Sequence, residues 1–334
     1  MKILVTGGCG FIGSHVVDAF VDEGHEVVIV DNLSSGTLAN KNEQARFYRA
    51  DICTQELEEI IHDEGPEMIF HHAAQISVPL SVRDPLTDAE VNIKGTLRLL
   101  ELSRMHGIKR FVFASTGGAI YGEAREVPTP EDYVPQPYSP YAISKLSCEH
   151  YVRFYEKQHN LRHVILRYSN VYGPRQIPHG EAGVVAIFAE ALLGKKLPIL
   201  NHFPGEPDGM VRDYCFVRDI ASANLLAAKT NKHGTYNIGT GKGTTTGQLY
   251  REILQTLRLK GIDLPQLYDL PRTAEAREGD IRVSTLNVDR AGAELGFRPV
   301  FQLKEGLAQT VAWYLNQSKV SSETKKQQQR SEGR

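Results

Sequence analysis

The chain has few cysteines, and none of them is arranged for a disulfide framework or a zinc site. Only four occur in 334 residues, and no two stand in C-x-x-C spacing. Scattered thiols of this kind are typical of a protein from a reducing compartment. The four positions are Cys9, Cys53, Cys148 and Cys215.

Long apolar runs and an excess of one charge are also missing. No stretch approaches the roughly 20 apolar residues that span a bilayer, and the first residues lack the charged-then-apolar pattern of a secretory signal. The formal net charge is −2, which gives no electrostatic footprint for nucleic acid. We therefore expect a cytoplasmic protein with neither a membrane segment nor a nucleic-acid partner.

The first 167 residues alternate short apolar segments with amphipathic ones. The second apolar segment, 26–31, is almost continuous in Val and Ile, as in a parallel strand that is covered on both faces. This order predicts an α/β fold, a Rossmann-type doubly wound parallel sheet. Strands are predicted at 2–6, 26–31, 45–48, 68–71, 110–115 and 163–167, and helices at 11–23, 55–62, 88–106 and 139–159.

After residue 167 the alternation loosens, because prolines and glycines divide the chain into short pieces. We expect 1–167 to form the dinucleotide-binding domain and 168–317 to form mainly a smaller C-terminal α/β lobe for the substrate, with some segments returning to the sheet. The polar segment 318–334 is predicted to be a disordered tail. Helices in the lobe are predicted at 183–193, 217–230, 246–257 and 304–316.

A glycine-rich turn follows the first predicted strand. Gly7, Gly10 and Gly13 lie where missing side chains let backbone amides and a helix N-terminus approach a pyrophosphate. Asp31 ends the next strand, where a carboxylate accepts hydrogen bonds from ribose hydroxyls and repels a 2′-phosphate. No arginine follows in 32–36. The pattern predicts NAD as the cofactor, in preference to NADP.

Two further strand ends carry residues suited to a dinucleotide. Asp51 and Ile52 end the third strand, where a carboxylate can meet the adenine amino group, although an exposed loop acid is the alternative. Ala73 and Ala74 end the fourth strand and leave room for a flat ring. The histidine pair at 71–72 has no second ligand pair at suitable spacing, so we predict no metal.

Tyr141 and Lys145 lie one helical turn apart, and the positive charge of such a lysine favours the phenolate form of the tyrosine. This pairing predicts a phenol with useful general-base strength. Chance alone supplies such a pair in many chains of this size, so its meaning depends on the glycine turn before it.

The motifs together resemble those of the extended short-chain dehydrogenase/reductases, and among them the UDP-glucose 4-epimerases are most similar. The resemblance runs from residue 1 to about residue 317. Besides the residues above, it rests on Asn92-x-x-Gly95-Thr96 and on the run Arg167-Tyr168-Ser169-Asn170-Val171-Tyr172-Gly173-Pro174.

The resemblance implies two sets of binding residues. The dinucleotide would be held by Gly7, Gly10, Phe11, Ile12, Asp31, Asn32, Leu33, Ser34, Ser35, Gly36, Asp51, Ile52, Ala73, Ala74, Gln75, Asn92, Tyr141, Lys145 and Tyr168. A UDP-sugar would be held by Ser115, Thr116, Asn170, Val184 or Val185, Arg212, Arg277 and Ser284. The planar forks of the two arginines suit a diphosphate.

The chain departs from the family's pattern at one catalytic position. The family has Ser or Thr four residues before the tyrosine of a Val/Ile-Tyr-Gly turn, and its hydroxyl meets the sugar 4-OH. Here that position is Gly117. Either Thr116 takes this role as a third catalytic residue, or Tyr141 works without it, and the sequence leaves both possibilities open.

The resemblance implies epimerisation at C4 of a UDP-hexose, through a 4-keto intermediate, by a homodimer that pairs helices 88–106 and 139–159. The alternatives are a UDP-glucuronate 4-epimerase, a nucleotide-sugar dehydratase or decarboxylase, and a non-catalytic NAD-binding regulator. The lyases carry acids where this chain has Gly118 and Ala119, which disfavours them. Ser284, where related enzymes vary between bulky and small residues, predicts room for an N-acetylated sugar.

Overall fold

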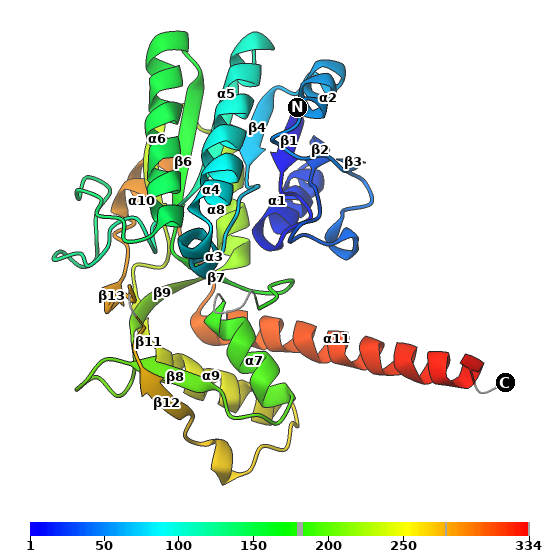
Figure 1. Cartoon of the computed structure of the whole chain (residues 1–334), viewed down its shortest axis with the longest axis vertical. Helices are drawn as coiled ribbons and strands as arrows, with labels where there is room; N and C mark the ends of the chain where they lie inside the picture. The colour runs from blue at the N-terminus through cyan, green and yellow to red at the C-terminus, as the bar shows by residue number, and fades with distance from the viewer. Residues whose placement is uncertain (179–182, 278, 333–334) are drawn as a thin grey trace.

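A central sheet of seven parallel strands organises the molecule (Figure 1). The structure, a computed structural model, describes residues 1–178, 183–277 and 279–332, with side chains up to residue 317. The strand order is β10-β6-β5-β4-β1-β2-β3. The strands are β1 (Lys2–Thr6), β2 (Glu26–Val30), β3 (Arg46–Tyr48), β4 (Met68–His71), β5 (Arg110–Thr116), β6 (Arg162–Tyr168) and β10 (Gly234–Ile238).

Helices cover both faces of this sheet because its strands are apolar on both sides. In β1, Ile3 and Val5 belong to one buried cluster and Leu4 belongs to the other, as the alternation of a strand requires. The first cluster includes α1 (Phe11–Asp22), α8 (Val217–Lys229) and α10 (Asp289–Leu295); the second includes α2 (Glu56–Glu64), α5 (Gly95–Met105) and α6 (Pro140–His159). The predicted doubly wound fold is confirmed.

The strand order reverses between β1 and β4, which are neighbours at the centre of the sheet. In open α/β sheets a ligand binds at the carboxyl ends of the strands beside such a reversal. The glycine turn leaves β1 at this point, so the fold places the predicted cofactor residues where ligands bind.

The predicted helix 88–106 is divided in the structure. α4 (Pro85–Ala89) passes into a π-helical turn, η2 (Glu90–Lys94), before α5 begins. Asp84 caps α4 through the amide of Thr87, and a proline follows it at the first helical position, so this helix begins earlier than predicted. A preceding short helix, α3 (Val78–Arg83), was not predicted.

A smaller lobe lies below the sheet in Figure 1, with its own buried core. Its strands are β7 (Asn170–Tyr172), β8 (Ile199–His202), β9 (Val211–Phe216), β11 (Gly243–Thr245), β12 (Arg272–Glu275) and β13 (Val283–Ser284). Its helices are α7 (Val184–Leu193), α9 (Thr246–Leu259) and α11 (Leu303–Glu332), with a 3₁₀ turn at Gln266–Tyr268. Another 3₁₀ turn, Leu38–Asn40, lies between β2 and β3 of the large sheet. One strand from beyond residue 167, β10, pairs in parallel with β6 at the edge of the large sheet.

Helix α11 continues to Glu332, across the segment for which composition predicted a disordered tail. Polar residues such as Lys, Gln and Glu are good helix formers, so a lack of apolar residues does not by itself exclude a helical backbone. Within the described residues, no helix has both the length and the apolar character needed to cross a membrane.

Candidate active site

A cleft lies at the carboxyl ends of the parallel strands, beside the reversal in strand order. Its empty volume is about 980 Å³, including the part open to solvent. It is lined by Gly7, Gly10, Phe11, Ile12, Gly13, Val30, Asp31, Asn32, Ser34, Ser35, Ala50, Asp51, Ile52, His72, Ala73, Ala74, Ile76, Val91, Ala114, Ser115, Tyr141, Lys145 and Tyr168. Most of the predicted cofactor residues therefore meet in one place.

The glycine turn has the geometry that a pyrophosphate needs. Gly7 has φ of +70°, and a Cβ atom there would lie 2.7 Å from the backbone nitrogen of Ala73. A Cβ at Gly13 would lie 2.1 Å from the carbonyl oxygen of Gly7. Gly10 caps α1 without a side-chain hydrogen bond, so no side chain occupies the amides at the helix N-terminus. These features fit a dinucleotide phosphate.

Asp31 holds the turn together as well as facing the cleft. Its carboxylate accepts hydrogen bonds from the backbone amides of Cys9 at 2.9 Å and Leu33 at 2.8 Å. The next residue, Asn32, donates to Asp51 at 2.7 Å, which joins two strand ends that the sequence analysis assigned to one nucleoside. The acid at 31 and the absence of arginine beside it fit the ribose of NAD.

Four predicted cofactor residues do not line the cleft. Leu33 turns its side chain toward the core beside α1, and Gly36 lies close to Cys9 behind the turn. Asn92 is buried, and its side-chain amide accepts from the backbone nitrogen of Gln75 and donates to the backbone carbonyl of the same residue. The Gln75 side chain in turn donates to Asp88, so Gln75 and Asn92 shape the loop beside the cleft and do not line it.

The sequence analysis missed several lining residues. Ile76 and Val91 contribute apolar surface from the segments next to Gln75 and Asn92. His72 also lines the cleft, and its ring nitrogen Nε2 lies 3.1 Å from the hydroxyl of Tyr168. The signal that could have identified these lining residues is their position next to residues of the recognised motifs. Burial lowers the pKa of His72 to about 3, so this ring is neutral.

His71 is fixed between two threonine hydroxyls. Thr96 donates its only hydroxyl proton to the carbonyl of Asn92, at 2.6 Å, so it must accept from Nε2 of His71 at 3.0 Å. Nδ1 of His71 therefore accepts from Thr6, at 2.7 Å. Among the described residues, no group of His, Cys, Asp and Glu is arranged to hold a metal ion.

Tyr141 and Lys145 both line the cleft from the first two turns of α6, where Ser139 caps the helix. Lys145 is 4% exposed, and its Nζ lies 4.6 Å from the centre of the Phe113 ring. Burial lowers the pKa of Lys145 to about 8. Burial, and then the charge of Asp88, raise the pKa of Tyr141. Burial and Asp88 therefore act against the phenolate form, in the direction opposite to the one expected from a lysine one helical turn away.

The turn after β5 explains the unusual Gly117. A Cβ atom at this residue would lie 2.5 Å from Cδ1 of Leu286, so the Leu286 side chain occupies the space of any side chain there. The neighbouring Ser115 lines the cleft but donates its hydroxyl to Glu149 at 2.6 Å. Thr116 pairs with Tyr168 in the sheet and is partly exposed.

Two predicted sugar-nucleotide residues, Ser115 and Thr116, lie at the end of β5, and Ser115 lines the cleft. The others lie on the smaller lobe, outside the lining of this cleft. Arg212 on β9 pairs in register with Ser284 on β13. Among the described residues, Oδ1 of Asn170 is buried without a hydrogen-bond partner, and a Cβ atom at Gly118 would lie 3.3 Å from it. Val184 begins α7 directly after its N-cap residue Gly183, and the side chain of Val185 is buried in the lobe core.

Arg277 follows β12, next to Asn201. With the amide of Asn201 turned so that its oxygen faces the guanidinium, that oxygen accepts from Nε and Nη2 of Arg277 at 3.1 Å. Burial lowers the pKa of Arg212. Arg212 is half-buried, and a guanidinium in such a place gains from an anionic partner, which a diphosphate would supply.

The fold and the cleft define a dinucleotide-binding protein of the Rossmann class with a tyrosine and a lysine at its cofactor site. The model of the NAD dependent epimerase/dehydratase family matches residues 3–239, and the chain belongs to that family.

Three similar proteins were compared over almost their whole length. The UDP-glucose 4-epimerase of Mycolicibacterium smegmatis is 42% identical, over 95% of this chain and 100% of its own. A crystal structure of the Thermotoga maritima UDP-glucose 4-epimerase with UDP-glucose has a TM-score of 0.88 and 47% identity, covering 95% of this chain and 99% of that one. The Thermus thermophilus enzyme in complex with NAD has a TM-score of 0.86 and 43% identity, covering 94% and 99%.

Proposed function

We propose that this protein is an NAD-dependent isomerase that interconverts UDP-glucose and UDP-galactose. The observation that carries the proposal is the meeting of the glycine turn, Asp31, Tyr141 and Lys145 in one cleft. Relatives that share more than two fifths of its sequence over nearly the full chain are named UDP-glucose 4-epimerases. We assign 1–167, with β10, to cofactor binding and 168–317 mainly to the sugar nucleotide.

The cleft residues divide the cofactor between them. The glycine turn and the N-terminus of α1 would hold the pyrophosphate, Asp31 would bond a ribose, and Asp51 with Ile52 would face the adenine. Lys145 would bond the second ribose, since its nearly buried side chain lines the cleft. When bound, NAD supplies a hydride acceptor and donor at C4 of the sugar.

Tyr141 would take the proton of the sugar 4-OH and later return it to the same oxygen, after the 4-keto sugar has turned its other face to the cofactor. Burial and Asp88 raise the pKa of this phenol, so a base at neutral pH needs positive charge beside it. The Lys145 ammonium and a nicotinamide cation are such charges. Thr116 would supply the second hydroxyl at the 4-OH, because Leu286 excludes a side chain at Gly117.

The sugar nucleotide would extend from the cleft into the smaller lobe. Arg212 and Arg277 would pair with the diphosphate, and the unpartnered Oδ1 of Asn170 would accept a hydrogen bond from the ligand. The amides at the start of α7, at Val184 and Val185, add donors near that charge. Ser284 would face the 2-substituent of the sugar and leave room for an acetamido group.

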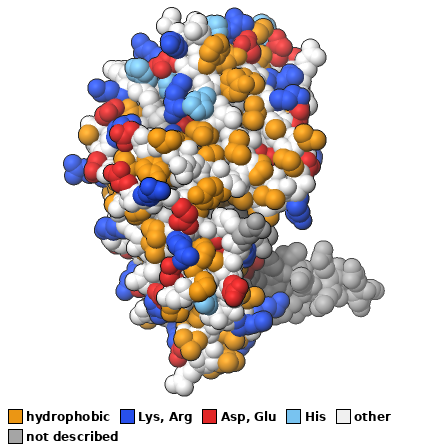
Figure 2. All heavy atoms as spheres, turned by 60° about the vertical axis from the view of Figure 1, so that its left-hand side comes forward, with side chains coloured by type: hydrophobic (Ala, Val, Ile, Leu, Met, Phe, Trp, Pro, Cys, Tyr) orange, Lys and Arg blue, Asp and Glu red, His pale blue; other side chains and the backbone are white. Residues whose placement is uncertain are grey.

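The protein would act as a homodimer through the outer face of α6. Ile143 and Phe154 of α6 are each 50% exposed, and α3 and α4, which pack against α6, carry the exposed Val82 and Leu86. Figure 2, in which this side of the molecule is turned forward, shows hydrophobic side chains spread over its upper part. In α5, Leu99 and Leu102 belong to the buried cluster beneath the sheet and are not available to this face. Light scattering at micromolar concentration should give a dimeric mass; a monomeric mass would count against this interface.

The cysteines fit a cytoplasmic location, because all four are unpaired and three are buried.

The function is tested by incubating the purified protein with UDP-glucose, UDP-N-acetylglucosamine or UDP-glucuronate and identifying the products by NMR. We expect UDP-galactose from UDP-glucose, and UDP-N-acetylgalactosamine from the N-acetylated sugar. Conversion of UDP-glucuronate alone would make the protein a uronate epimerase. A 4-keto-6-deoxy or decarboxylated product would make it a lyase, and no product from any sugar would leave a binding protein.

A further inference from the structure

A buried ion pair lies behind the cleft, between β6 and α6. Arg167 is 2% exposed and donates to Glu149 from Nε at 2.9 Å and from Nη2 at 2.7 Å. Glu149 also accepts from Ser115 at 2.6 Å and from Arg153 at 2.8 Å, so each of its oxygens has two donors. Burial acts to raise the pKa of Glu149, but the bonds from Arg167 outweigh it and the pKa is lowered. The pair is charged and fully satisfied.

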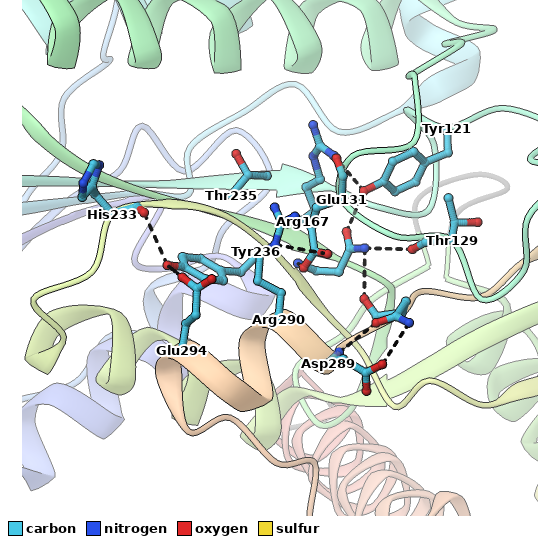
Figure 3. A network of polar contacts seen from close by, with 12 residues as sticks. Tyr121, Thr129, Glu131, Arg167, His233, Thr235, Tyr236, Asp289, Arg290 and Glu294 are labelled. Carbon is cyan, nitrogen blue, oxygen red and sulfur yellow. Dashed lines mark hydrogen bonds and ion pairs between the residues drawn. The ribbon is translucent and has the colours of Figure 1, made fainter.

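The free edge of the Arg167 guanidinium leads to the turn after β5 (Figure 3). Nη1 donates to the hydroxyl of Tyr121 at 2.7 Å and to the carbonyl of Glu131 at 3.0 Å. An arginine cannot accept, so the Tyr121 proton goes to Oδ1 of Asn237, at 2.8 Å. Burial raises the pKa of Tyr121 to about 12, which keeps the phenol protonated. The direction of each bond is therefore fixed.

Asn237 carries the chain of bonds to the smaller lobe. Its Nδ2 donates to the carbonyls of Thr129, at 2.9 Å, and Asn287, at 3.1 Å (Figure 3). The Thr129 amide donates to Thr285 at 2.8 Å, and the Asn287 amide donates back to Thr129 at 2.9 Å. The segment 285–287 directly follows β13, which holds Ser284 opposite Arg212.

The chain of contacts closes on the turn where it began. Leu286, in the middle of this segment, is 1% exposed and packs against Gly117. Ser115, at the start of the same turn, bonds Glu149. The ring thus joins the end of β5 to the segment after Ser284 twice, once by hydrogen bonds through Arg167 and Asn237 and once by the Leu286 side chain.

We propose that Tyr121, Arg167 and Asn237 are positioning residues that hold the turn 115–121 and the segment 284–287 as one unit. Given the proposed function, this unit sets Thr116 and Ser284 together on either side of the sugar, although none of the three residues lines the cofactor cleft. Replacing a buried ion pair by apolar residues often leaves stability unchanged, so stability alone does not explain the network. The network is explained by its effect on geometry, because it fixes the turn 115–121 relative to the segment 284–287.

The link is tested with Tyr121→Phe, which keeps the ring and removes the hydroxyl that joins Arg167 to Asn237. Tyr133→Phe is the matched control, because Tyr133 lies beside Tyr121 and its hydroxyl accepts only from the exposed amide of Arg125 among the bonds described. Amide hydrogen exchange, followed by NMR, reports on both segments. Gly117 and Gly118 donate to Tyr168, and Thr129 and Asn287 donate across the second segment.

We expect Tyr121→Phe to speed exchange at all four amides together by about 10-fold or more, the effect of losing a hydrogen bond to a charged group. The amides of Gly7 and His72, bonded within the cofactor cleft, should be unchanged, as should every site in Tyr133→Phe. Faster exchange at Gly117 and Gly118 alone, or equal effects of both substitutions, would overturn the proposed coupling.

Kinetics give a second, separate result. In Tyr121→Phe we expect kcat with UDP-glucose to fall about 10-fold, with KM and NAD affinity changed by less than about 3-fold, because the diphosphate and cofactor contacts lie elsewhere. A lower melting temperature with unchanged kcat would reduce the network to a structural role and contradict the proposal. A wild-type protein without epimerase activity would refute the proposed function, while the exchange experiment would still decide the coupling.

Discussion

The cofactor side and the sugar side of this molecule are built in different ways. The cofactor cleft collects its residues from the ends of neighbouring strands in the first half of the chain, with Lys145 and Tyr168 completing it. The predicted sugar residues come instead from β7, β9, β13, the start of α7 and the segment after β12, in a lobe with separate small sheets. Binding at strand ends fixes a cofactor through the fold itself. On the sugar side, the site depends on how distant segments are held together.

We propose that residues on the cofactor side carry out the chemical step and that residues on the sugar side select the substrate. Tyr141 lies in the cleft, whereas Ser284 and Arg212 lie on paired strands of the lobe. Substitutions on the two sides should therefore change different kinetic quantities.

The largest effect is expected from Tyr141→Phe, which removes the proton acceptor and keeps the ring. Turnover should fall by at least about 100-fold, the scale of one general base. NAD binding, measured by fluorescence titration, should persist because the glycine turn and Asp31 are untouched. Near-normal turnover in this variant would show that Tyr141 is not the base.

On the same side, Asp31→Ser with Asn32→Arg should exchange the cofactor preference. Loss of the carboxylate removes its bonds to the ribose, worth about 1.5–3 kcal/mol, so NAD should bind about 10- to 100-fold more weakly. The added arginine should favour the 2′-phosphate of NADP. Because Asp31 also bonds two backbone amides, a thermal melt must accompany the titration. Tighter binding of NADP than NAD by the wild type would refute the assignment.

At the boundary between the two sides, Thr116→Val should cost about 1.5–3 kcal/mol of transition-state stabilisation if its hydroxyl meets the sugar 4-OH. The measurement is kcat/KM with UDP-glucose. Ser115→Ala is a useful comparison, since the Ser115 hydroxyl bonds Glu149. An unchanged rate in Thr116→Val would leave Tyr141 as the only side chain acting at that hydroxyl.

The smallest and most selective effect is expected on the sugar side, from Ser284→Tyr. The larger side chain should fill the space for an acetamido group, lowering turnover of UDP-N-acetylglucosamine by about 10-fold or more while UDP-glucose changes by less than about 3-fold. Parallel loss with both sugars would point to disruption of β13 instead. A wild type that converts UDP-glucose but not the N-acetylated sugar would show that another residue closes this pocket.

The same contrast explains how far the sequence could be interpreted. The fold class and the residues of the cleft follow local rules, since strand, glycine turn and helix are adjacent in the chain, as around Gly7 and Asp31. The π-helical turn at Glu90–Lys94 was not predictable from apolar spacing, because hydrogen bonds between Asn92 and the distant Gln75 accompany it.

Contacts across long sequence separations were also beyond the sequence analysis. At Gly117 the sequence shows only that the family's hydroxyl is missing. In the structure, the side chain of Leu286, far along the chain, lies where a Cβ atom at this position would be. Likewise, the spacing of Tyr141 and Lys145 predicted an activated phenol, while burial and Asp88 act in the opposite direction. Desolvation depends on the packed structure and leaves no pattern in the sequence.

The most direct test of the central claim follows the hydrogen at C4 of the sugar. UDP-glucose carrying deuterium at C4 is incubated with the purified protein in ordinary water, and the product is examined by NMR and mass spectrometry. We predict UDP-galactose that retains deuterium at C4, because the cofactor would take up and return the same hydride while Tyr141 handles only the hydroxyl proton. Loss of the deuterium to solvent, or a product with an unchanged configuration at C4, would contradict it.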